Sequence, residues 1–163
     1  MPIEKTQQWI INFVLHHNLC PFAHHPHQQG RIRYQLSTAE NIDDIIQEFL
    51  EELDLLERNE TQTTLIIYAA QFTLFSEYLD LVAILEEVLN DQKREDTYQL
   101  ASFHPQYLFA DSDYDDPANA TNRSPFPMIH LLRWNDVYQA INNHPDTLGI
   151  PERNIALLRS LHP

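Results

Sequence analysis

The sequence predicts a single α/β domain that spans residues 1–163. Two observations predict this fold. Segments with strand patterns alternate with segments whose apolar residues recur every three or four positions, as in amphipathic helices. A chain of 163 residues also fits one domain, and neither a linker nor an internal repeat divides it. The expected order is a βαβαββα core with an N-terminal helix and an extra C-terminal helix. That order matches a thioredoxin-like core, whereas a ferredoxin-like βαββαβ order fits less well.

The N-terminal third is predicted to form a helix, a strand and a second helix. An apolar face defines the first helix over residues 6–17, and alternation of polar and apolar residues defines a strand over 31–37. Ser37 and Glu40 match the capping-box pattern S-x-x-E, so the second helix is expected to open there and to extend to Leu56. Acidic residues between the apolar ones indicate a solvent-exposed face of this helix.

The middle of the chain is predicted to contain the central strand. Residues 63–70 form an apolar run rich in β-branched side chains, as expected for a strand covered on both faces. Thr73 is expected to cap the helix that follows. The residues expected to face inward from this helix are Phe75, Tyr78, Leu79, Val82, Leu85 and Leu89.

Two further strands are predicted at 97–104 and 127–133, followed by helices that begin at Asn135 and near Pro151. The connection between these strands is far longer than the usual length of about four to six residues. Loops of this length are generally functional or disordered, and several aromatic residues indicate that part of this one is packed. A functional site is therefore expected near this loop.

The chain is strongly acidic, with 24 Asp and Glu residues against 10 Lys and Arg and a formal net charge of −14. Such a chain repels nucleic acids and anionic membranes, so neither is an expected partner. No stretch approaches the roughly 18–20 apolar residues of a membrane span, and the N-terminus lacks the pattern of a signal peptide. A single cysteine cannot form an internal disulfide, which favours a cytoplasmic location. No cofactor is predicted.

Polar side chains are expected to meet where the last two strands pair. If these strands are antiparallel, His104 at the end of one lies beside residues 121–125 near the start of the other. That segment contains Asn122, Arg123 and Ser124. An imidazole, an amide, a guanidinium and a hydroxyl group would then converge at one edge of the sheet.

Cys20, the only cysteine, reaches this edge under one condition on the topology. In the thioredoxin-like arrangement the third strand runs antiparallel to the first, and its end lies beside the start of the first strand. If the third strand instead runs parallel to the first, the chain from Cys20 to Gly30 must extend along the sheet with little slack.

Several short segments occur in an order that resembles one bacterial family of small single-domain proteins, the domain-of-unknown-function family 1415. These segments are LCPFA at 19–23, RY at 33–34, ASFHPQYLFA at 101–110, TNRSPFP at 121–127, HLLR at 130–133 and ERN at 152–154. The resemblance covers essentially the whole chain and implies no mechanism, because the family has no established activity. It implies that the family's characteristic segments contain Cys20, His104, Asn122, Arg123 and Ser124. The histidines at 24–27 are not part of that pattern.

Each candidate residue has a structural and a functional interpretation. Cys20 is either a small buried side chain or a nucleophilic thiolate. His104 either satisfies a backbone carbonyl in a turn or acts as a general base. Asn122 either forms an Asx-turn or orients His104, and Arg123 either binds an anion or pairs with an aspartate of its own loop.

Two functions follow from these alternatives. The first is an enzyme in which Cys20 is the thiolate, His104 its base and Asn122 the orienting group, with thiol-dependent hydrolase, transferase or monothiol redox chemistry. In this hypothesis Arg123 anchors an anionic small molecule. Ser124 and Arg33 are further candidate binding residues, although Arg33 would face either a helix or the site. The second function is a non-catalytic module that binds a small molecule or a partner.

A third interpretation concerns the histidine-rich N-terminal region. The candidate ligands are His16, His17, Cys20, His24, His25 and His27. Their spacing matches no established closed metal site, and His24 and His25 are adjacent. No physiological metal is therefore predicted. His130 lies in a buried strand pattern and is expected to be a core histidine.

Overall fold

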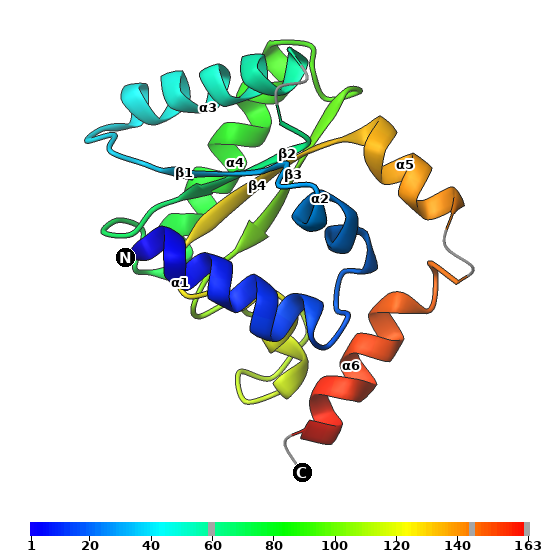
Figure 1. The fold of residues 1–163 in the computed structure, drawn as a ribbon. Coiled ribbons are helices and arrows are strands. Elements are labelled where there is room, and N and C mark those ends of the chain that lie inside the picture. Colours follow the sequence, from blue (N-terminus) through cyan, green and yellow to red (C-terminus); the bar gives the residue numbers. More distant parts are fainter. Residues whose placement is uncertain (59–60, 144–145, 162–163) are drawn as a thin grey trace.

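The computed structural model describes residues 1–58, 61–143 and 146–161. It is a mixed α/β fold built on a four-stranded sheet (Figure 1). The strands are β1 (Ile32–Leu36), β2 (Thr63–Ile67), β3 (Tyr98–Phe103) and β4 (Met128–Arg133). The helices are α1 (Pro2–Trp9), α2 (His24–Gln28), α3 (Ile42–Glu57), α4 (Phe75–Asp91), α5 (Trp134–Asn142) and α6 (Ile150–Leu161). A π-helical segment, Ile10–Leu15, continues α1, and short 3-10 turns occur at Pro21–Ala23 and Pro117–Thr121.

The strands lie in the order β1-β2-β4-β3 across the sheet. β1 and β2 are parallel, whereas β4 runs antiparallel to both of its neighbours, β2 and β3. The predicted antiparallel pairing of the last two strands is therefore confirmed. These pairings make β3 parallel to β1 and place it at the opposite edge of the sheet. The expectation from the thioredoxin-like arrangement, that the third strand runs antiparallel to the first, is wrong.

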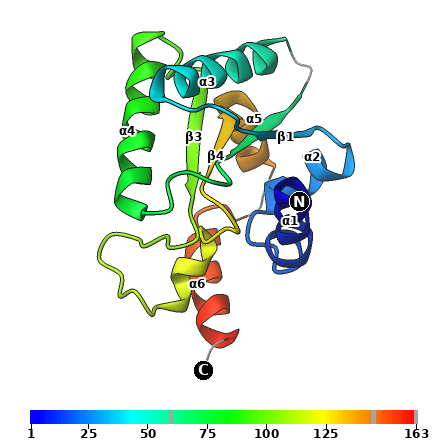
Figure 2. The ribbon, with the colours of Figure 1, turned by 90° about the vertical axis from the view of Figure 1, so that its left-hand side faces the viewer.

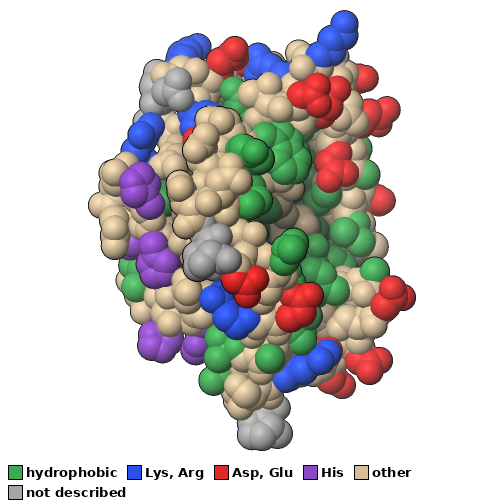
Figure 3. Space-filling model, turned by 90° about the vertical axis from the view of Figure 1, so that its right-hand side faces the viewer, with side chains coloured by type: hydrophobic (Ala, Val, Ile, Leu, Met, Phe, Trp, Pro, Cys, Tyr) green, Lys and Arg blue, Asp and Glu red, His purple; other side chains and the backbone are tan. Residues whose placement is uncertain are grey.

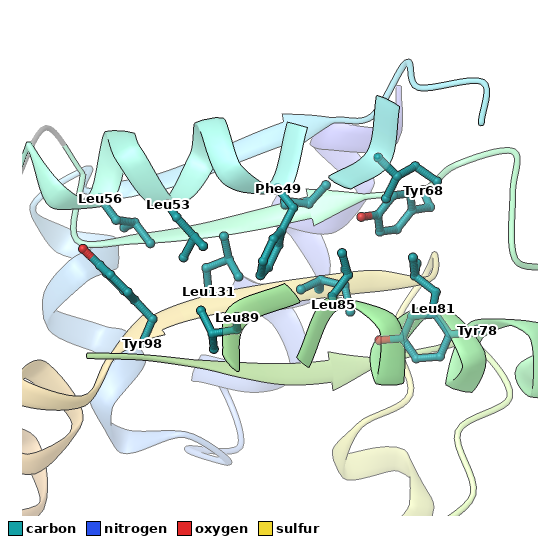
Figure 4. Packing of buried hydrophobic residues seen from close by; sticks show 13 residues of the cluster. Phe49, Leu53, Leu56, Tyr68, Tyr78, Leu81, Leu85, Leu89, Tyr98 and Leu131 are labelled. Carbon is teal, nitrogen blue, oxygen red and sulfur yellow. The ribbon is translucent and has the colours of Figure 1, made fainter. Parts of the chain in front are cut away.

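Helices cover the two faces of the sheet unequally. α3 and α4 lie together on one face, and α1 with α2 lies on the other (Figures 1 and 2). The main hydrophobic core fills the space between the α3–α4 layer and the sheet (Figure 4). Its fully buried members include Phe49, Leu53, Leu56, Ile66, Tyr78, Leu85 and Leu131. All five residues of β2 are buried, as predicted for a strand covered on both faces.

Both predicted helix caps are wrong. Asn41 is the N-cap of α3, and its side chain accepts a hydrogen bond from the Asp44 amide at 3.0 Å, so the helix begins after the Ser37–Glu40 box. α4 begins after Leu74, with no side-chain cap. Leu79, expected to face inward, is 45% exposed. Leu81 is buried instead, because the buried stripe of α4 runs through positions 78, 81, 85 and 89.

The free edge of β3 is partly closed by its own chain. The Trp134 amide donates to the Thr97 carbonyl, so these two residues form a hydrogen-bonded pair. Hydrogen-bonded and non-hydrogen-bonded pairs alternate along an antiparallel ladder, and the backbone N–H and C=O groups of Tyr98, Leu100 and Ser102 therefore point away from β4. At one end of the edge, the Tyr98 amide donates to the Arg94 carbonyl at 2.9 Å. Within the described part of the chain, no helix is both long and apolar enough to cross a membrane.

Candidate functional site

His104 and Asn122 are brought together by the pairing of β3 with β4. The His104 amide donates to the Asn122 carbonyl at 3.1 Å, and the Asn122 side-chain amide donates to the Ser102 carbonyl at 3.0 Å. Asn122 thus bonds the backbone at the end of β3 on both sides of Phe103. No hydrogen bond between its side chain and the imidazole of His104 occurs in the described residues.

The imidazole of His104 is completely buried against α4. Its ring lies 5.2 Å from the ring of Phe75 and 5.1 Å from that of Tyr78. Nδ1 accepts a hydrogen bond from the Gln106 amide at 3.0 Å, so the proton is on Nε2, which donates to the Phe72 carbonyl at 2.9 Å. Burial lowers the pKa of His104, although the bond to Phe72 opposes this effect. His104 is therefore neutral near pH 7, and both ring nitrogens already have partners.

Arg123 holds the long loop between β3 and β4. Its Nε donates to the Tyr107 carbonyl at 3.0 Å, and a terminal nitrogen donates to the Tyr114 carbonyl at 2.8 Å. The guanidinium also lies 5.0 Å from the centre of the Tyr114 ring, within range of a cation–π interaction. Ser124 is buried, and its hydroxyl donates to the Phe126 carbonyl at 2.6 Å.

The alternative partners of Arg123 are four aspartates of its own loop, Asp111, Asp113, Asp115 and Asp116, and one of them is bonded elsewhere. Asp116 receives two hydrogen bonds from Arg159 of α6, at 3.1 and 2.6 Å. These bonds, with a further one from the Ala118 amide, lower the pKa of Asp116 to about 2. The described residues contain no ion pair that joins Arg123 to a carboxylate.

Cys20 lies at the other side of the sheet, where the chain leaves the N-terminal helix. It begins the 3-10 turn Pro21–Ala23, and the carbonyl of the preceding residue, Leu19, accepts a bond from Asn154 of α6 at 2.7 Å. Burial raises the pKa of the Cys20 thiol, and bonds from the amides of Phe22 and Ala23 offset this only in part. His104 packs on Phe75 and Tyr78 of α4, whereas Cys20 lies in the segment between α1 and α2, the helices that cover the other face of the sheet (Figure 2).

Arg33 lies apart from both groups, in a groove of about 600 Å³ between β1 and α3. Its guanidinium donates to both carboxylate oxygens of the buried Glu52, at 2.8 to 3.1 Å, and to the Gln35 side chain at 2.9 Å. The other ionised residues that line this groove are Asp44, Glu48, Glu51, Asp54 and Arg58. A groove with this excess of carboxylates repels anions, so its charge does not suit the predicted role of Arg33.

Removing Arg33 is expected to destabilise the fold, because it leaves the Glu52 carboxylate buried without its charged partner. Arg33→Met should lower the free energy of unfolding by about 1–3 kcal/mol, less than for a fully buried pair since Arg33 is 37% exposed. Arg94→Met is the control, because its carboxylate partners Asp54 and Glu57 are exposed, and it should cost below about 1 kcal/mol. Urea unfolding measures both, and equal losses would contradict the prediction.

The histidine-rich region shows contacts among rings rather than a cluster of ligands. The rings of His16 and His17 meet edge to face at 4.8 Å, and His25 bonds to Gln29 at 3.0 Å. Over residues 1–58, 61–143 and 146–161, no group of three or more His, Cys, Asp or Glu side chains is arranged to hold a metal ion.

Comparison with known proteins identifies the family. A family model described as a protein of unknown function, DUF1415, matches residues 1–163. The chain belongs to the DUF1415 family. This membership confirms the resemblance noted in the sequence, and the family description assigns no activity. Searches of curated proteins and of solved structures found no match.

One exposed apolar surface of this DUF1415 protein was not predicted in the sequence analysis. Trp134, Tyr138 and Ile141 lie on α5 and are 44%, 62% and 38% exposed. Their spacing of i, i+4 and i+7 is the signal that could have identified them, since it places three large apolar side chains along one stripe of a helix.

Proposed function

We propose that this protein is a non-catalytic binding module. One observation carries the proposal: both ring nitrogens of His104 are bonded to backbone groups inside the fold. A general base needs a free nitrogen within hydrogen-bond reach of the proton that it removes. The buried imidazole instead satisfies the Phe72 carbonyl and the Gln106 amide, which is a structural role.

The environment of Cys20 supports the same proposal. A nucleophilic cysteine needs a lowered pKa, from a nearby cation, a helix N-terminus or an imidazolium. Burial raises the pKa of Cys20, so the side chain is a thiol near neutral pH. Burial and the amides of Phe22 and Ala23 account for its pKa, with no contribution from His104, which gives no support to a thiolate–imidazole pair.

Both arginines that were candidates for binding an anion are bonded within the fold. The guanidinium of Arg123 is bonded to two loop carbonyls and that of Arg33 to Glu52, so neither offers an open fork to an anion. Binding of an anionic small molecule and a cytoplasmic location stay predictions. The large side chains exposed along α5 favour a protein partner, because contiguous apolar surface and exposed Trp and Tyr are typical of protein interfaces.

The reactivity of Cys20 tests whether the module is non-catalytic. Iodoacetamide reports on this thiol alone, since the chain has no other cysteine. Alkylation of the folded protein near pH 8 should be at least about tenfold slower than in denaturant, and its apparent pKa should lie above that of a free thiol. His104→Gln should leave this pH profile unchanged. A titration well below about 8.5 that moves upward in His104→Gln would establish a coupled thiolate and overturn the proposal.

A further inference from the structure

α5 is amphipathic but buries none of its residues. An amphipathic helix normally turns its apolar stripe toward a core, as α3 and α4 do here. On α5 the stripe of Trp134, Tyr138 and Ile141 is exposed to solvent over about 10 Å, the rise of seven residues. Figure 3 faces the side of the molecule that carries α5 and shows hydrophobic side chains gathered around a hollow.

One end of this stripe contacts a turn that contains two acidic residues. The indole nitrogen of Trp134 donates to the Glu95 carbonyl at 2.8 Å, which fixes the ring beside the turn before β3. Glu95 and Asp96 in this turn are exposed, and neither forms an ion pair with another described residue. Neighbouring Arg94 does not neutralise them, because its guanidinium bonds to Asp54 and Glu57 of α3. An exposed tryptophan is thus bonded to a turn with two exposed acidic residues, for which the described part of the chain shows no ion pair.

The charges indicate what covers this surface. From Trp134 to Gly149 the chain contains two acidic residues and no Lys or Arg, and the whole chain carries a formal charge of −14. A second copy would therefore bring no cation from this segment to Glu95 and Asp96 and would add repulsion. A basic side chain complements them, since it can pair with a carboxylate and stack on an indole ring.

We infer that Trp134, Tyr138 and Ile141, together with Glu95 and Asp96, form a docking site for a basic amphipathic helix of a protein partner. These five residues are the α5 surface. A Lys or Arg of the partner pairs with the carboxylates beside Trp134, and its apolar residues pack along Tyr138 and Ile141. The inference rests on the proposed binding function and names its site and its partner class.

Model peptides and fluorine NMR test the inference on the full chain. The protein has two tryptophans, so labelling with 5-fluorotryptophan gives one resonance from the α5 surface and one from Trp9, which packs on Phe103 as an internal reference. The probe is a Leu/Lys peptide of about 18 residues, long enough to form an amphipathic helix. Two comparison peptides carry Glu in place of Lys, or the same composition in scrambled order.

The Leu/Lys helix should shift the Trp134 resonance and leave that of Trp9 in place. Tyr138→Ala should weaken binding by about tenfold, as expected for a central aromatic contact. Glu95→Gln with Asp96→Asn should weaken it by about three- to tenfold in low salt and remove most of its salt dependence. The matched control, Glu86→Gln with Glu87→Gln on the exposed face of α4, makes the same change in charge and should have less than about a twofold effect.

Peptide binding tests the α5 surface, whereas alkylation of Cys20 tests the proposed function, so the two can fail independently. Equal binding of the Leu/Glu helix would overturn the basic partner. An unchanged affinity in Tyr138→Ala, a shift confined to Trp9, or no binding of any peptide would overturn the α5 surface as the site. Sedimentation that shows a dimer broken by Tyr138→Ala would assign the surface to a second copy and would also overturn the inference.

Discussion

Replacing Tyr78 with phenylalanine is expected to lower the free energy of unfolding by about 2–4 kcal/mol. The buried hydroxyl of Tyr78 donates to the Met128 carbonyl at 2.7 Å and accepts from the Phe103 amide at 2.9 Å. It bridges β3 and β4 at the end of their ladder, so its removal leaves a donor and an acceptor of the backbone without a partner. Each such group costs about 1–3 kcal/mol when buried.

Tyr68 provides a matched control in the same core (Figure 4). Its side chain is equally buried, but its hydroxyl has no hydrogen-bond partner among the described residues. Tyr68→Phe removes an unpaired polar atom and should therefore be neutral or slightly stabilising. Urea unfolding of both variants at neutral pH measures the difference. Similar losses of stability in the two variants would show that the Tyr78 bridge contributes little.

Acid is expected to destabilise the protein through His130. Nε2 of this residue bonds to the hydroxyl of Thr63 at 2.5 Å, and burial lowers the pKa of His130 from 6.5 to about 4. Between these two values the unfolded chain binds a proton that the folded chain does not, so stability falls as the pH decreases from about 6.5 toward 4. A pKa difference of this size corresponds to a loss of up to about 3 kcal/mol. Burial lowers the pKa of His104 as well, and His104 adds a loss of the same sign.

Comparison of two variants isolates the contribution of His130. His130→Gln retains an N–H group that can reach Thr63 but does not titrate, so its unfolding free energy should change less than that of the parent between pH 7 and 4.5. His25→Gln removes an exposed histidine instead and should keep the pH dependence of the parent. Thermal or urea unfolding across this pH range gives the difference directly. If His130→Gln and the parent lose stability in parallel, the protons are bound elsewhere.

The elements could be predicted from the sequence where a local pattern decides them. The apolar, β-branched run at the centre of the chain forms the buried strand β2, and the last two strands pair antiparallel as expected. The caps of α3 and α4 were predicted wrongly. Ser37 and Thr73 match local capping patterns, but in the folded protein the two helices begin after Asn41 and Leu74. The direction of β3 relative to β1 depends on which strands become neighbours, and no local pattern in either strand specifies that.

The candidate site was predictable in part for a similar reason. Pairing of β3 with β4 is enough to bring His104 beside Asn122. The state of the imidazole could not be foreseen, because its partner Phe72 lies 32 residues away in the loop before α4. Arg123 binds backbone carbonyls, which every residue has, so no side-chain pattern marks its partners. The α5 surface left a readable pattern, but exposure can be seen only once the helix is placed.

The bond from Asn122 to Ser102 has a consequence for how this protein behaves at high concentration. β3 is an uncharged edge strand without proline, and such a strand invites pairing with the edges of other molecules, the first step of aggregation. The Arg94 carbonyl bonds to one end of the edge and the Asn122 amide to the other, so among the described residues the backbone groups left open lie around Leu100. Two residues far apart in the sequence thereby shorten the free edge. Asn122 thus helps to keep the protein from polymerising through its own sheet.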